Sequence, residues 1–230
     1  MAFASNRGVA GSGVRLFRQA NLYQRAANGA GQDELLFQSD TAKAPTDWTR
    51  DGRFIIFRQA TLAQNKTHLF ALPVTGDKKP IPLLASEFNE AMGQVSPDGR
   101  WLAYASDESG HYEVYVVPFA PGASRPISGK WQISLGDGRD PRWRGDGREL
   151  FYVTSTRKMM AVEIKATGDS LARGTPRVLF DMPYATEGDT LSRYAVSADG
   201  KRFLMAAEPN VSSEAPPLRM TVNWLAGVKK

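Results

Sequence analysis

The stretch that decides the fold is Gln94–Ser109, which reads QVSPDGRWLAYASDES. Pro97, Asp98 and Gly99 form a turn signal directly before the apolar run WLAYA at 101–105. This order is typical of a tight hairpin that leads into a buried strand. Proline, aspartate and glycine fit the dihedral angles of a turn, and the apolar run that follows suits a strand in the core. We therefore expect a β-hairpin at the centre of the chain.

The same phrase occurs at three other places in the sequence. It reads WTRDGRFIIF at 48–57, WRGDGRELFY at 143–152 and VSADGKRFLM at 196–205. One aspartate marks the shared position in each of the four repeats: Asp51, Asp98, Asp146 and Asp199. These aspartates are 47, 48 and 53 residues apart. Repeats of this length that are built from short strands are typical of a β-propeller.

The strand pattern predicts an all-β propeller with four-stranded antiparallel blades in a single domain, residues 1–230. The chain divides into five blade-like units, at about 1–40, 46–86, 91–135, 140–181 and 192–230. The first unit begins one strand into a blade, because MAFAS at 1–5 matches LAYAS at 102–106, and the last unit lacks a fourth strand. The two deficits do not complement each other, so we expect an incomplete, open ring of a propeller with six or more blades.

Composition fits a folded chain and excludes several classes of site. With 230 residues, 42% of them hydrophobic, the chain can bury a sizeable core without a metal or a disulfide. The net charge of +5 is spread along the chain without a long basic run, so we expect no nucleic-acid partner. The absence of cysteine excludes disulfides, cysteine nucleophiles and thiolate metal sites, but is compatible with reducing and oxidising compartments.

The first residues carry no export signal that the sequence reveals. MAFASNRGVAGSG at 1–13 lacks a basic segment followed by a long apolar stretch. No apolar run approaches the ~18 residues that a membrane helix needs. We expect no membrane segment in this chain, and a cytoplasmic location if the chain is complete.

The four repeated aspartates are candidates for metal ligands or general acids, but a turn role explains them better. An aspartate before glycine accepts local backbone hydrogen bonds, and the radial symmetry of a propeller keeps one such residue on each blade. The only histidines, His68 and His111, lack a third nitrogen or thiolate ligand for zinc. No Gly-x-Ser-x-Gly nucleophile motif occurs. We therefore predict no catalytic residue, no metal site and no cofactor, and that the chain is not an enzyme.

Three further features have a binding interpretation and an ordinary one. The tryptophans can stack ligands, but Trp48 and Trp143 occupy a repeat position where the other repeats have valine, which favours packing. The acidic loop Asp107–Ser109 can present carboxylates to a cation or a basic partner, although such loops are usually solvated. The glycine-rich segment GVAGSG at 8–13 lacks the lysine of a phosphate-binding loop, so a surface loop is favoured.

The phrases SPDGRWLAYASDESGHYEVYV at 96–116 and DPRWRGDGRELFYV at 140–153 resemble TolB-like, WD-type propeller repeats of bacterial extracytoplasmic proteins. They are especially similar to the propeller that follows the membrane helix in some bacterial serine/threonine protein kinases. The resemblance implies a propeller in the periplasm or at the cell surface. None of the sequence motifs of a kinase domain is present in this chain.

The resemblance leads to two functional expectations. The first is a non-catalytic binding, sensing or scaffolding module that recognises a protein or a small ligand, with self-association through open propeller edges. The alternative is a substrate-filter or sensor propeller of a longer enzyme, a kinase or a peptidase, whose catalytic domain lies outside this chain. A lactonase that works alone is the least favoured, because it needs several acidic or asparagine ligands facing one channel.

Overall fold

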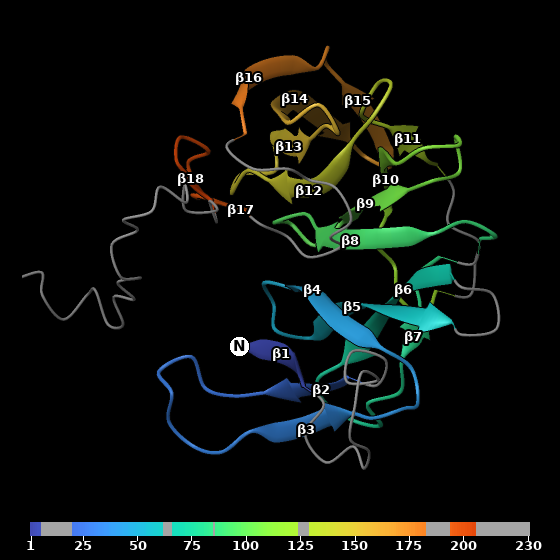
Figure 1. Cartoon of the computed structure of the whole chain (residues 1–230), viewed down its shortest axis with the longest axis vertical. Coiled ribbons are helices and arrows are strands. Elements are labelled where there is room, and N and C mark those ends of the chain that lie inside the picture. The colour runs from blue at the N-terminus through green and yellow to red at the C-terminus, as the bar shows by residue number, and fades with distance from the viewer. Residues whose placement is uncertain (6–19, 62–65, 85, 124–128, 183–193, 206–230) are drawn as a thin grey trace, which may run out of the picture.

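In the computed structural model, residues 1–5, 20–61, 66–84, 86–123, 129–182 and 194–205 are described. Every regular element in these ranges is a β-strand, and the strands form successive antiparallel sheets that follow one another along the chain (Figure 1). Within the same ranges there is no helix with the length and apolar character of a membrane span. The all-β prediction is confirmed.

The first sheet has three strands and the second has four. They are β1 (Ala2–Ser5), β2 (Asn21–Gln24) and β3 (Glu34–Phe37), followed by β4 (Lys43–Trp48), β5 (Phe54–Thr61), β6 (Lys66–Pro73) and β7 (Ile81–Pro82). The second sheet is a simple meander in the order β4-β5-β6-β7. The strand β4 contacts β1 and β2 of the first sheet.

The third and fourth sheets contain the two clearest repeats. They comprise β8 (Glu90–Val95), β9 (Trp101–Ser106), β10 (Glu113–Pro118) and β11 (Trp131–Gln132), then β12 (Arg139–Trp143), β13 (Glu149–Val153), β14 (Lys158–Thr167), β15 (Ser170–Arg173) and β16 (Arg177–Asp181). The third sheet is again a four-stranded meander. In the fourth, β14 pairs with β13 and with β16, which completes the predicted blade.

The strand β15 is an addition that the sequence prediction missed. Residues 159–163 of β14 pair with β13 within the blade. Residues 164–167 extend past the end of β13 and pair with β15 in a hairpin. Gly168, with φ of +55°, lies at the tip of this hairpin. The fourth blade therefore carries a protruding β14–β15 hairpin that the third blade lacks (Figure 1).

The last described sheet consists of β17 (Tyr194–Val196) and β18 (Phe203–Met205). The third strand predicted for this unit, at 220–224, lies outside the described residues. In the described ranges, β1 pairs only with β2 and β17 only with β18, so no strand pairing joins the first sheet to the last. The described chain thus forms an open multi-bladed propeller, as the sequence predicts.

The hydrophobic core lies between consecutive blades. Side chains of β9 and β10, such as Trp101 and Val116, pack against Leu150 and Val162 of the next blade. A second cluster joins the second and third blades in the same way. Each fully buried aliphatic or aromatic side chain in these layers contributes about 1.5–3 kcal/mol, so face-to-face packing of blades is the main stabilising contribution.

The inner strands β4, β8 and β12 share one irregularity. Each contains a β-bulge at the same place in the repeat, between Pro45 and Asp47, between Ala91 and Gln94, and between Arg139 and Arg142. A bulge bends a strand and re-aims the side chains that follow it. The side chains of Asp47, Gln94 and Arg142 therefore stand at one register position in three successive blades.

Candidate functional site: a basic cleft on the fourth blade

In all four repeats, the aspartate organises its own hairpin turn. A carboxylate oxygen accepts a hydrogen bond from the backbone N–H two residues later, in the pairs Asp51–Arg53 (3.0 Å), Asp98–Arg100 (3.1 Å), Asp146–Arg148 (3.0 Å) and Asp199–Lys201 (3.0 Å). The glycine that follows has φ between +71° and +74° in every turn. These bonds are the local role predicted for the four residues.

Three of the turns have the same second contact. A hydroxyl two residues before the aspartate donates to its carboxylate, from Thr49 (2.6 Å), Ser96 (2.5 Å) and Ser197 (2.5 Å). The bond from Thr49, with the N–H of Arg53, lowers the pKa of Asp51 to about 2. The bond from Ser197 likewise lowers the pKa of Asp199. Each of the three carboxylates is therefore committed to hydrogen bonds within its own turn.

The fourth blade departs from this pattern, because Arg144 stands where the other turns have a hydroxyl. Its Nε and Nη2 atoms donate to the two carboxylate oxygens of Asp146 at 2.8 and 2.7 Å. This two-pronged contact holds the pKa of Asp146 well below its usual value and raises the pKa of Arg144. Arg144 also donates from Nη1 to Glu149 Oε2 at 3.3 Å.

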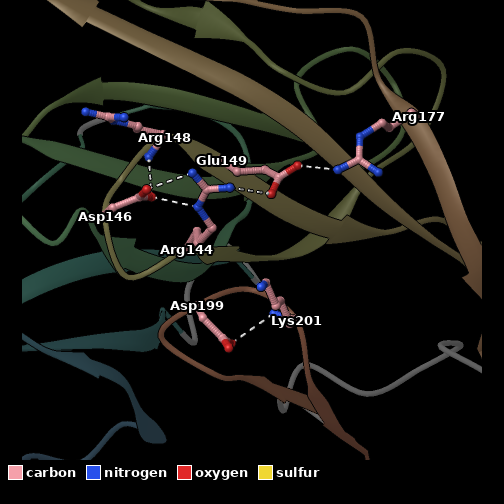
Figure 2. A network of polar contacts seen from close by, with 7 residues as sticks. All are labelled: Arg144, Asp146, Arg148, Glu149, Arg177, Asp199 and Lys201. Carbon is pink, nitrogen blue, oxygen red and sulfur yellow. Dashed lines mark hydrogen bonds and ion pairs between the residues drawn. The ribbon is translucent and has the colours of Figure 1, made fainter.

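Glu149 links the turn to the outer strand of the same blade. It is the first residue of β13 and is buried, and its second oxygen accepts a hydrogen bond from Arg177 at the start of β16. Figure 2 shows Asp146, Arg144, Glu149 and Arg177 as a row of alternating charges. A buried carboxylate needs such partners, because one left without them costs several kcal/mol.

Arg144, Glu149 and Arg177 of this row line a cleft of about 690 Å³, and we call these three residues its floor. The lining residues come from the turn, from β14 with its extension and from β16: Arg144, Arg148, Glu149, Glu163, Ile164, Lys165, Ala166, Thr167 and Arg177. Four of them are cationic and two are carboxylates, so the lining is net basic. We call it the basic cleft.

Arg148 and Lys165 are the cations of the basic cleft that remain available to a ligand. Arg144 and Arg177 both contact Glu149, whereas the side chains of Arg148 and Lys165 are exposed and make no hydrogen bond or ion pair within the described ranges. In Figure 2 the guanidinium of Arg148 extends away from the row of paired charges. Arg148 lies on the turn and Lys165 on β14, and the two come from neighbouring segments, because the N–H of Ile164 donates to the carbonyl of Arg148 at 2.9 Å.

The β14–β15 hairpin that forms one wall is fixed to the third blade. Leu171 is buried in the core cluster that contains Trp101. Arg173 Nε donates to the carbonyl of Gln132 at 2.7 Å, and the Arg100 guanidinium donates to the carbonyl of Gly168 at the hairpin tip. The wall is therefore held from base to tip, and a pre-formed site loses less entropy when it binds.

The fifth blade packs on the other side of the turn. The N–H of Gly145 donates to the carbonyl of Ala198 at 2.9 Å. A Cβ atom on Gly200 would lie only 2.7 Å from Cδ of Arg144, and its φ of +71° also favours glycine. The turn at 197–201 thereby holds the stem of Arg144 in place, next to Asp199 and Lys201 in Figure 2.

The two histidines lie apart, each beside its own buried carboxylate. His68 Nδ1 is 3.2 Å from Glu90 Oε2, and His111 Nε2 is 3.1 Å from Glu113 Oε1. Across the described part of the chain, no group of three or more His, Cys, Asp or Glu side chains is arranged to hold a metal ion. The glycine-rich segment at 8–13 lies outside the described residues.

The other candidates from the sequence are engaged in the fold. Trp101 is buried, and the half-buried Trp143 donates from Nε1 to the carbonyl of Gln94 in the preceding blade at 3.2 Å. In the acidic loop, Asp107 accepts hydrogen bonds from the backbone and side chain of Asn89, at 2.8 and 2.6 Å. Glu108 of the same loop binds Lys130. This loop is therefore not simply solvated.

Sequence reasoning missed the basic cleft, although two signals pointed to it. One was the arginine at 144, where the other repeats have threonine or serine. The other was the turn signal TGDS at 167–170, which marks a hairpin between the third and fourth strands predicted for this unit. The pairing of Arg177 with Glu149 had no such signal, because it depends on the register of β14 and β16.

No family model and no curated protein matches this chain. Solved structures do match. The structure superposes on TolB from Acinetobacter baumannii with a TM-score of 0.60 at 16% identity, over 92% of this chain and 47% of that one. Its fold is similar to that of TolB-like β-propellers. The identity is too low to transfer any residue's role, and this chain spans about half the length of that TolB.

Two enzymes share the fold and correct one prediction. The periplasmic gluconolactonase of Pseudomonas aeruginosa matches with a TM-score of 0.57 at 20% identity, over 88% of this chain and 60% of that one. A puromycin-hydrolyzing peptidase from Mycobacterium tuberculosis matches with a TM-score of 0.56 at 18% identity, over 80% and 30%. The prediction that this chain is not an enzyme is wrong, because its grounds were the fold and the lack of a motif, and this fold occurs in enzymes.

Proposed function

We propose that this chain is a ligand-binding β-propeller whose basic cleft recognises an acidic segment of a protein partner. The observation that carries the proposal is the pair of exposed cations in the cleft lining, Arg148 and Lys165, whose side chains make no hydrogen bond or ion pair in the described ranges. Arginine and lysine attract carboxylates over several ångströms, and complementary charge speeds association and selects partners.

An extended acidic segment fits the cleft better than a small anion. The floor cations are already paired, Arg144 with Asp146 and Glu149 and Arg177 with Glu149, so positive charge does not converge on one point. The available charges come instead from two residues, Arg148 on the turn and Lys165 on β14, which suits a ligand with more than one carboxylate. Glu163, also in the lining, repels a carboxylate placed beside it and adds selectivity for position.

The wider setting of this function follows from the fold and the repeats. We propose that the five units form one domain and that it works in the periplasm. The similarity to a periplasmic gluconolactonase and the resemblance of the repeats to those of extracytoplasmic proteins support this location. Fractionation of the source cells tests it: we expect the protein in the periplasmic fraction, and its recovery with cytoplasmic markers would contradict the location.

A second candidate is a propeller within a longer enzyme. This chain covers only 30% of the peptidase that it matches, so a fold of this kind occurs as part of a larger catalytic protein. The resemblance of the repeats to kinase-associated propellers belongs to the same candidate. Sequencing the gene upstream of Met1 tests it: an open reading frame that continues into a kinase, peptidase or membrane segment supports it, and a stop codon directly upstream argues against it.

The recognition of acidic segments can be measured with a fluorescein-labelled hexaglutamate peptide by fluorescence anisotropy. Two exposed ion pairs contribute at most about 1 kcal/mol each, so the double variant Arg148→Ala/Lys165→Ala should bind about tenfold more weakly than wild type. The control Arg50→Ala/Lys79→Ala removes the same charge from two exposed positions of the second unit and should bind within about twofold of wild type. Equal losses in both variants, or no binding by wild type, would contradict the proposal.

A further inference from the structure

A second pocket lies between the second and third blades. Its lining has more carboxyl groups than cations, unlike that of the basic cleft. Its volume is about 250 Å³, and its lining comes from both blades: Leu84, Ser86, Glu90, Tyr104, Glu108, Val117, Gly129 and Lys130. Glu90 begins β8, at the end of the strand away from the Asp98 turn. None of these residues lines the basic cleft, so the two sites are independent.

Lys130 is part of the pocket lining, and its ammonium group has aromatic and acidic partners. Its Nζ lies 4.4 Å from the ring centroid of Tyr115 and 5.9 Å from that of Tyr104, and it binds the carboxylate of Glu108. A cation within about 6 Å of an aromatic ring is attracted by the negative face of the ring. Two rings and one carboxylate therefore form a cage that fits a primary ammonium.

A second carboxylate lines the same pocket. The side chain of Glu90 is 2% exposed; it accepts a hydrogen bond from Ser86 Oγ at 2.5 Å, and His68 Nδ1 is 3.2 Å from its other oxygen. Burial, with the negative charges of Glu108 and Glu90, raises the pKa of Tyr104. The lining thus contains two carboxyl groups and one lysine.

Lys130 is placed so that it can leave. Its side chain is 39% exposed, and its only ion pair in the described ranges is with Glu108. The preceding Gly129, with φ of +94°, lets the backbone fold over Trp131, where a Cβ atom would come within 2.4 Å of the indole. If the Lys130 side chain turns toward solvent, its ammonium leaves the cage and no core residue has to move.

We propose that this pocket is a recognition site for the lysine side chain of a protein partner, and that Lys130 occupies it until the partner's lysine replaces it. The incoming ammonium takes the position of the Lys130 ammonium, against the same two rings and the same carboxylate, and Glu90 is a second carboxyl group in the pocket lining. Because Lys130 competes for the cage, the measured affinity is reduced by the fraction of molecules in which the cage is occupied. This is self-competition within one chain, and removing Lys130 relieves it.

The test uses Nα-acetyl-lysine N-methylamide as the probe, and NMR shifts of the Tyr104 and Tyr115 rings as the readout. The variant Lys130→Met removes the competing charge and should bind the probe about tenfold more tightly than wild type, with the cage free in every molecule. Adding Glu108→Gln to that variant should reverse the gain. The control Lys158→Met removes a lysine that pairs with Asp181 on the fourth blade and should leave the affinity unchanged.

Two further probes separate the sources of the ammonium. The Nε-acetylated form of the probe has no charge and should not bind. The free diamine 1,5-diaminopentane should bind no more tightly than the lysine derivative, and tighter binding would assign the pocket to small amines and overturn the lysine assignment. Unchanged affinity in Lys130→Met, or equal binding of the uncharged probe, would overturn the site itself.

Discussion

The third and fourth blades are two copies of one repeat, yet only the fourth carries the basic cleft. In the third blade every residue of β9 is buried, and Ser96 completes the Asp98 turn with a short hydroxyl contact. The fourth blade keeps the buried strands but replaces that serine with Arg144 and extends β14 into a hairpin. The buried positions of the repeat thus maintain the propeller, whereas its rim is free to acquire a binding surface.

The inner strands show the same division in a single register position. Asp47, Gln94 and Arg142 are equivalent in the second, third and fourth blades, yet one is acidic, one neutral and one basic. The neutral one crosses to its neighbour, with Gln94 Nε2 donating to the carbonyl of Thr46 at 2.7 Å. The acidic one does the same, because Asp47 Oδ2 accepts from the N–H of Val95 at 2.7 Å.

The largest effect is expected from breaking the shared core of these two blades. Trp101 is 3% exposed and packs edge-to-face on Trp131 with ring centroids 5.4 Å apart, so Trp101→Ala should lower the free energy of unfolding by about 3–5 kcal/mol. Trp143 is only half-buried, so Trp143→Ala should cost about 2 kcal/mol, which includes its bond to Gln94. Urea denaturation measures both. A larger loss of unfolding free energy for Trp143→Ala than for Trp101→Ala would contradict the prediction that the buried Trp101 contributes more to the shared core.

The second effect depends on pH and comes from Asp47. Burial raises its pKa to about 6 from 3.8, only partly offset by the N–H of Val95. Between these two pKa values the folded state holds a proton that the unfolded state releases. The free energy of unfolding therefore falls as pH rises from about 4 to about 6, by roughly 3 kcal/mol at most. Asp47→Asn keeps an oxygen for Val95 and removes the ionisation.

The check is the difference in unfolding free energy between Asp47→Asn and wild type, measured from pH 4 to pH 8. We expect the free energy of unfolding of the variant to rise relative to that of wild type as pH rises through this window. At pH 8 the variant should be the more stable protein. Asp146→Asn is the control, because the pKa of Asp146 is lowered and the group is exposed, so its removal should confer no gain at pH 8. A difference for Asp47→Asn that stays constant with pH would show that the buried carboxyl is not the cause.

The smallest effect on stability is expected from making the fourth turn like the third. In Arg144→Ser a hydroxyl can donate to Asp146 as Ser96 does to Asp98, so the free energy of unfolding should change by less than about 1 kcal/mol. Glu149 would keep only Arg177 as a charged partner, and the cleft floor would become more negative. Hexaglutamate should then bind more weakly to a protein of nearly unchanged melting temperature. A large loss of stability would show that Arg144 is mainly structural.

The features that recur in every repeat could be predicted from the sequence, whereas the features found in single blades could not. The Asp-Gly turns and the buried strands that follow them have local signals, and the structure places all four turns as expected. The glutamates Glu90, Glu113 and Glu149 gave no signal, because each is buried through partners that are distant in the chain or on another strand. Burial of a carboxylate is decided by tertiary pairing, which a single sequence does not display.

The central claim is that Arg148 and Lys165 give the basic cleft its preference for acidic segments. The most direct measurement is the binding of labelled hexaglutamate and labelled hexalysine to the charge-reversed variant Arg148→Glu/Lys165→Glu, by anisotropy at low salt. The account predicts that hexaglutamate binding is lost and that hexalysine binds more tightly than it does to wild type, with an unchanged melting temperature. Hexaglutamate binding equal to that of wild type would contradict it.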